Sequence, residues 1–148
     1  GKWLKINSYN GAGLNDAGWL CRTAEMENDK SVTIDLTEKV TANGVVRADI
    51  VKTNAPRKIR MGFYALPELD MPIVTKETKV DGKKAITIDN GHYALTTVLA
   101  DGWGGIEVVR CKDLHPEADN SVVVNLTATV KGQKELKSQL IMKKSKRK

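Results

Sequence analysis

Two segments of similar sequence decide the fold, SVTIDLT at residues 31–37 and SVVVNLT at residues 121–127. Apolar and polar residues alternate in the first segment, with Val32, Ile34 and Leu36 on one side. This period of two is typical of a strand that buries one face and leaves the other in water. The chain has 148 residues, of which 41% are hydrophobic and 28% charged, and this balance indicates a globular fold rather than a disordered chain.

Strand signals continue on both sides of these segments, separated by turn residues. A hairpin turn at Ala42-Asn43-Gly44 follows the first segment, and Asp81-Gly82 and Asn90-Gly91 are further turn signals. No amphipathic helix is predicted, apart from a single helical turn over residues 113–119. Many short strands between turns indicate an all-β sandwich or barrel. The further predicted strands cover residues 45–51, 59–64, 73–75, 85–88, 93–99, 106–111, 121–130 and 136–142.

The two segments belong to a longer internal match at an offset of 90 residues. Five of the ten positions in 31–40 are identical to those in 121–130, and the same offset places Cys21 on Cys111. Alternation explains the shared apolar positions but not serine, threonine and cysteine in one register. The match predicts a duplication that gives two similar small domains, residues 1–76 and 77–148.

The first half carries four features in order: Trp19-Leu20, the alternating strand over 32–36, the Arg47 to Val51 strand and the strand Ile73-Val74-Thr75. With these features it resembles the BACON group of immunoglobulin-like domains of Bacteroidetes and their phages. Lys76 follows the last strand where the family often has Gln. The second half keeps only the alternating strand and its successor. The resemblance implies two tandem immunoglobulin-like β-sandwich domains and a role in binding or building rather than catalysis.

Positive charge is concentrated at the C-terminus. The net charge is +6, from 24 Lys and Arg against 18 Asp and Glu, and residues 143–148 carry most of it. A short basic tail suits an acidic protein surface, a phosphate backbone or plain solubility. We expect a tail that binds an acidic partner surface through its five basic residues, Lys143, Lys144, Lys146, Arg147 and Lys148.

Catalytic and metal-binding patterns are not apparent. Cys21 and Cys111 lack zinc-site spacing and are each expected to be a buried thiol, although a disulfide between them stays open. His92 is expected beside a turn, and His115 lies among acidic residues in a segment better explained as a solvated loop. We therefore expect no enzyme, no cofactor and no metal.

Exposed tryptophan is the one feature that favours a small ligand. Trp103 lies between glycines in Gly102-Trp103-Gly104-Gly105, where an exposed indole could stack on a sugar ring or contact a partner. Trp19 is better explained as a core residue. The glycines of this loop, and Gly11-Ala12-Gly13, are interpreted as loops or bulges rather than phosphate cradles.

These features lead to one expected function and two alternatives. We expect a virion structural protein, a capsid decoration or auxiliary protein of a tailed phage that binds coat subunits after synthesis in the host cytoplasm. No run of residues has the ~18–20 apolar residues of a membrane span, and we expect no membrane partner. The alternatives are a carbohydrate-binding module using Trp103 and a nucleic-acid-associated protein bound through residues 143–148.

Overall fold

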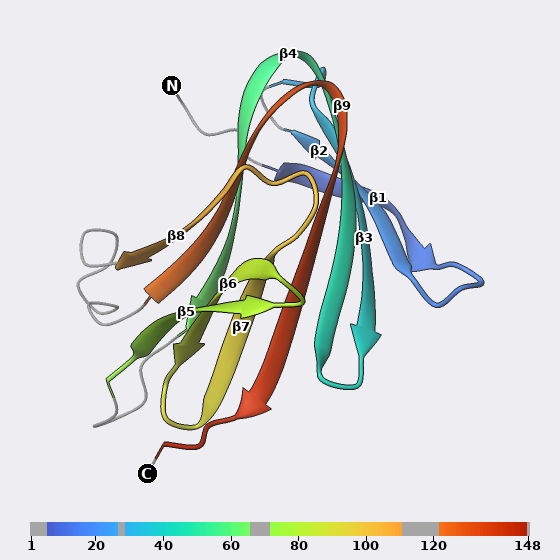
Figure 1. Cartoon of the computed structure of the whole chain (residues 1–148). Coiled ribbons are helices and arrows are strands. Elements are labelled where there is room, and N and C mark those ends of the chain that lie inside the picture. Colours follow the sequence, from blue (N-terminus) through green and yellow to red (C-terminus); the bar gives the residue numbers. More distant parts are fainter. Residues whose placement is uncertain (1–5, 27–28, 66–71, 111–121, 148) are drawn as a thin grey trace.

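A computed structural model describes residues 6–26, 29–65, 72–110 and 122–147, and these form a nine-stranded antiparallel sheet (Figure 1). The strand order is β1-β2-β3-β4-β9-β7-β6-β5, and β8 also pairs with β9. The all-β expectation is therefore confirmed. The strands are β1 (Ile6–Leu14), β2 (Leu20–Met26), β3 (Thr33–Thr41), β4 (Gly44–Ala65), β5 (Val74–Val80), β6 (Lys83–Asp89), β7 (Tyr93–Leu99), β8 (Gly105–Arg110) and β9 (Val122–Lys144).

The two long strands, β4 and β9, pair with each other and bend together. Their pairing runs from Gly44↔Ile141 to Ala65↔Val122, with one interruption between Thr53 and Arg57. Figure 1 shows both strands rising on one side of the molecule, turning over at the top and descending on the other side. The pair therefore belongs to two layers. One layer holds β1, β2, β3, β7, β6 and β5, and the other holds β8.

The corner has identifiable causes in the sequence. A bulge at the corner places three residues of β4 opposite one residue of β9, Lys131. The three residues are Asn54, Ala55 and Pro56, and a bulge of this kind bends a strand pair. Pro56 has no backbone N–H to donate, so it is tolerated where the ladder is interrupted. On the partner strand, Gly132 has a φ of 80°, a conformation that glycine adopts without strain.

Side chains fix the connection between β2 and β3 to this corner. Arg57 Nη2 lies 2.6 Å from Asp29 Oδ2, and Ser31 Oγ donates to Asn54 Oδ1 at 2.8 Å. The Ser31 hydroxyl and the Arg57 guanidinium also lower the pKa of Asp29.

The core lies between the two layers. Residues of β6, β7 and the C-terminal half of β9 face residues of the N-terminal half of β9, with β8 and the end of β4 beside them. In the large layer, alternation along each strand puts the core residues on the side that faces the small layer. We call this side the inner face of the large layer. The buried members of the two joining clusters are Val51, Ile73, Ile86, Ile88, Leu95, Trp103, Val122, Val124, Leu126, Ala128, Val130 and Leu136.

Several predicted elements are confirmed. The β3–β4 hairpin turns at Ala42-Asn43, and β6 and β7 meet at the Asn90-Gly91 turn. Asp81 and Gly82, between β5 and β6, have φ values of 51° and 79°, which fits the type I′ turn that Asp-Gly favours. The predicted helical turn at 113–119 lies outside the described residues.

The arrangement as two tandem domains is not confirmed. The expected boundary at 76/77 falls inside β5, and β9 from the second half lies between β4 and β7 in one sheet. The two copies of the internal match also differ in structure. Residues 33–52 form the β3–β4 hairpin, whereas the matching residues of the second copy continue as one strand, because Gly132-Gln133 stand where Ala42-Asn43 make the turn. The predicted strands 59–64 and 136–142 are continuations of β4 and β9.

Candidate functional site

The basic C-terminal residues do not form a free tail. Lys143 and Lys144 complete β9 and pair with Ala94 and Tyr93 of β7. The non-strand segment thus begins at Ser145, and Lys148 lies outside the described residues. The expectation of a tail over 143–148 is corrected accordingly, because the strand ladder extends two residues into it.

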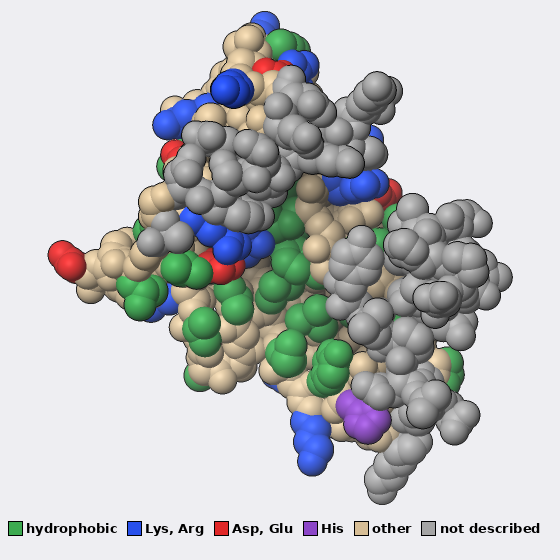
Figure 2. All heavy atoms as spheres, turned by 180° about the vertical axis from the view of Figure 1, so that it is seen from behind, with side chains coloured by type: hydrophobic (Ala, Val, Ile, Leu, Met, Phe, Trp, Pro, Cys, Tyr) green, Lys and Arg blue, Asp and Glu red, His purple; other side chains and the backbone are tan. Residues whose placement is uncertain are grey.

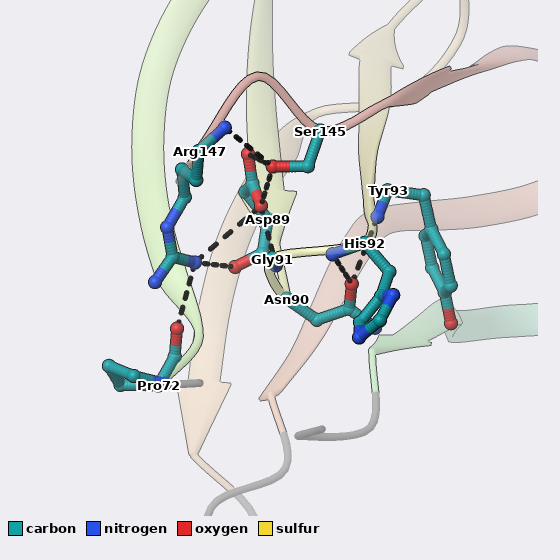
Figure 3. A network of polar contacts seen from close by, with 8 residues as sticks. All are labelled: Pro72, Asp89, Asn90, Gly91, His92, Tyr93, Ser145 and Arg147. Carbon is teal, nitrogen blue, oxygen red and sulfur yellow. Dashed lines mark hydrogen bonds and ion pairs between the residues drawn. The ribbon is translucent and has the colours of Figure 1, made fainter. Parts of the chain in front are cut away.

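Ser145 attaches this segment to the β6–β7 turn. Its Oγ donates to both carboxylate oxygens of Asp89, at 2.8 and 2.9 Å, and its backbone N–H donates to the His92 carbonyl at 2.8 Å. The same Oγ accepts from the backbone N–H of Arg147 at 3.1 Å. We call the contacts of Ser145 and Arg147 with Asp89 and Pro72 the C-terminal clasp (Figure 3).

Arg147 provides the other half of the clasp. Its Nη1 donates to the carbonyls of Pro72 and Asp89, both at 2.9 Å, and lies 3.5 Å from Asp89 Oδ1. One guanidinium thus joins Pro72, two residues before β5, with the end of β6 and the C-terminal segment (Figure 3). We expected Arg147 to bind a partner surface. The structure instead commits its side chain to contacts within the chain.

Local hydrogen bonds to the side chains of Asp89 and Asn90 fix the shape of the turn beneath the clasp. The Asn90 side-chain oxygen accepts from the backbone N–H groups of His92 and Tyr93, at 3.0 and 3.1 Å, and Gly91 N donates to Asp89 Oδ1 at 2.7 Å. Asn and Asp favour such local bonds in turns. Asn90 is buried, whereas His92 is exposed beside the turn, as expected.

Three lysines surround the clasp without partners. Lys143, Lys144 and Lys146 are exposed, and none makes an ion pair with another described residue. Their backbones are held by the β9 ladder and by the clasp, so the three ammonium groups project from an ordered segment. This is a positively charged surface with little backbone entropy to lose on binding.

Trp103 is buried, which overturns its expected role as an exposed glycan or partner contact. Only 7% of the residue is exposed, and it packs with Leu126 and Leu136 between the layers. Gly102, with a φ of 95°, lets the loop lie against β9, where a Cβ would come 2.3 Å from the Glu135 carbonyl oxygen. Trp19 is half-buried, and Trp3 lies outside the described residues.

A second polar group lies on the inner face of the large layer. Asp49 of β4 is 1% exposed, and its Oδ2 lies 3.5 Å from Arg47 Nη2. Arg47 also lies 4.0 Å from Glu38, which is 3.9 Å from Arg22. Ser138 of β9 pairs with Arg47, and Thr97 of β7 pairs with Leu140, two residues beyond Ser138 on the same face. The hydroxyls of Ser138 and Thr97 and the Asp49 carboxylate are buried without a hydrogen-bond partner.

This burial has an electrostatic consequence. Desolvation raises the pKa of Asp49 above its ordinary value of 3.8, because the neighbouring Arg47 charge offsets the cost only in part. No signal in the sequence marks Asp49 as buried, since Arg47-Ala48-Asp49 resembles the exposed face of a strand.

The remaining candidates contribute little to a site. Cys21 is a free, half-buried thiol whose Sγ lies 3.6 Å from the Trp19 carbonyl, while Cys111 and His115 lie outside the described residues. Within the described ranges, no three His, Cys, Asp or Glu side chains are grouped as a metal site requires. That same part of the chain holds no helix long and apolar enough to cross a bilayer.

Comparison with known proteins places no family on this chain. Neither a family model nor a curated protein matches it. Among solved structures, it is similar to one named "Putative kojibiose phosphorylase from human microbiome", at 13% identity and a TM-score of 0.49. The match covers 96% of this chain but 23% of that protein, so the chain spans less than a quarter of its length.

The buried carboxyl predicts a pH-dependent stability. Because the folded-state pKa of Asp49 is raised, the folded state holds this proton more tightly than the unfolded state does. The contribution of Asp49 to the free energy of unfolding therefore increases as the pH falls from 7 toward 4. Asp49→Asn should remove this slope and stabilise the protein most at pH 7, as measured by urea unfolding. The control is Asp101→Asn, since this carboxylate is 73% exposed; an equal effect there would contradict the assignment.

The clasp predicts a loss of stability on truncating Arg147. Arg147→Ala removes two charge-assisted hydrogen bonds to carbonyls and should lower the free energy of unfolding by about 1–3 kcal/mol. Lys146→Ala, at the neighbouring exposed position, should change it by less than about 0.5 kcal/mol. Urea unfolding of both variants measures the difference, and equal stabilities would show that the clasp does not hold the C-terminus in solution.

Proposed function

We propose that the protein is a non-enzymatic structural protein of a virion, an auxiliary protein that binds coat subunits on a tailed-phage capsid. The observation that carries the proposal is the lysine group Lys143, Lys144 and Lys146, presented on a segment held by the clasp. The resemblance of the first half to immunoglobulin-like domains of Bacteroidetes and their phages supports the choice of a phage capsid as the assembly.

Binding would follow from electrostatic complementarity. The ammonium groups would face carboxylates of a neighbouring coat subunit, and the ordered segment would keep them in register with that surface. Opposite charges of this kind speed association and fix orientation, and salt weakens them because both partners are exposed.

The two other functions considered from the sequence find less support. Sugar stacking on Trp103 requires an exposed indole, and Trp103 is buried. A nucleic acid would bind the same three lysines through its phosphates, so binding to duplex DNA is one of the outcomes of the experiment below.

The experiment is co-sedimentation with capsids assembled without this protein. Truncation at Met142 would remove strand pairing and the clasp together with the lysines, so charge reversal is the sharper change. Lys143→Glu with Lys146→Glu should weaken pelleting about tenfold at low salt. The matched control reverses Lys131 and Lys134, two exposed lysines near the corner, in the middle of the β4–β9 pair and away from the clasp.

Each outcome decides the proposal. Saturable pelleting at a fixed ratio to coat subunits, lost in the first variant and kept in the second, supports it. A full chain that stays in the supernatant at low and high salt contradicts it. Equal binding to capsid-free duplex DNA, with a steep dependence on salt, would instead make nucleic acid the partner.

A further inference from the structure

Part of the inner face of the large layer is apolar and uncovered. Leu14 is 76% exposed, Val40 79% and Met142 52%, values unusual for large hydrophobic side chains in a described strand. They belong to a diagonal row across five strands, which we call the apolar strip. Its members are Leu14 (β1), Leu20 (β2), Val40 (β3), Val45 (β4), Leu140 and Met142 (β9).

Strand register places these residues together. Leu14 pairs with Leu20, and Val40 pairs with Val45, which pairs with Leu140. Cα partners in an antiparallel ladder share a face. Leu20 pairs with Glu38, and Val40 lies two residues further along β3 on the same face, so the row steps diagonally from β2 to β3. Four strand spacings make the strip about 19 Å long. Figure 2, which views the molecule from behind, shows hydrophobic side chains in a band across the lower half.

The strip is exposed because the second layer is narrower than the first. Leu140, at one end, packs against the core cluster that holds Val122 and Val124. Leu14, Leu20 and Val40 belong to neither of the two clusters that join the layers. They are also absent from the third buried cluster, which Ala24, Met26, Val32 and Leu36 form.

The two ends of the strip carry opposite charges. Asp16 follows Leu14 in the β1–β2 turn and is exposed. Lys144 follows Met142 by two residues, so strand alternation places it on the same face. Neither charge forms an ion pair with another described residue. A surface with an apolar middle and ends of opposite sign is complementary to itself when it is rotated by a half-turn.

We propose that the apolar strip is the interface of a symmetric homodimer. Two copies pack strip against strip about a two-fold axis near Val40 and Val45, the arrangement in which one patch serves both subunits. Asp16 then lies opposite Lys144 of the partner subunit, and the pair occurs twice. Lys143, on the other face, and Lys146 stay available for the partner of the proposed function.

Other occupants fit this surface less well. A nucleic acid offers no apolar surface to Leu14, Val40 and Met142. An anionic membrane would be repelled by Asp16, and no aromatic residue of the strip would anchor it at a lipid interface.

The first test is sedimentation velocity of the full chain over a range of concentrations. A concentration-dependent dimer is expected, and Val40→Asp should raise its dissociation constant by about tenfold or more, since the charge enters the interface twice. Val74→Asp is the control, because Val74 is 48% exposed on the edge strand β5, outside the strip. A monomer at every concentration, or equal effects of both substitutions, overturns the proposal.

The second test exchanges the charges. Asp16→Lys and Lys144→Asp should each weaken the dimer, and the double variant should restore it, which a folding defect would not do. Failure of restoration overturns the proposed arrangement. Lys143→Glu with Lys146→Glu should leave the dimer intact, so that failure of the dimer and failure of capsid binding are separate results.

Discussion

The pairing of β4 with β9 is the constraint on which the rest of the structure depends. Strands β3, β7 and β8 are bonded directly to this pair, β2 and β6 are bonded to those neighbours, and β1 and β5 close the two edges. The bulge at residues 54–56 and Gly132 let the pair turn without losing its register on either side. One bent ladder therefore builds both layers and closes the core between them.

Both proposed surfaces follow from this geometry. The half of the pair in the large layer gathers β1–β3 on one side and β7, β6 and β5 on the other, whereas the opposite half gathers β8. The small layer cannot cover the large one, and the apolar strip remains exposed. The end of β9 emerges beside the β6–β7 turn, where the clasp fixes the three lysines.

Local patterns in the sequence predict part of this structure. Alternation and turn residues locate β3, β6, β7 and the hairpin that begins β4, because these depend on neighbouring residues alone. They miss the continuity of β4 and β9, since Pro56 and Gly132 have the appearance of strand breaks. They also miss β1 and β2, whose alternation is weak. The burial of Trp103 and the contact of Arg147 with Asp89 join residues far apart in sequence, and no local pattern reports them.

The most direct test of the β4–β9 pair as the organising element is native-state hydrogen exchange. If this pair unites the chain, the backbone amides of residues 45–51 and 134–141 should exchange through one global opening, with the same free energy. The amides of 123–129 should belong to the same class. Separate exchange of residues 1–76 and 77–148, each with its own opening free energy, would contradict it and would restore two independent domains.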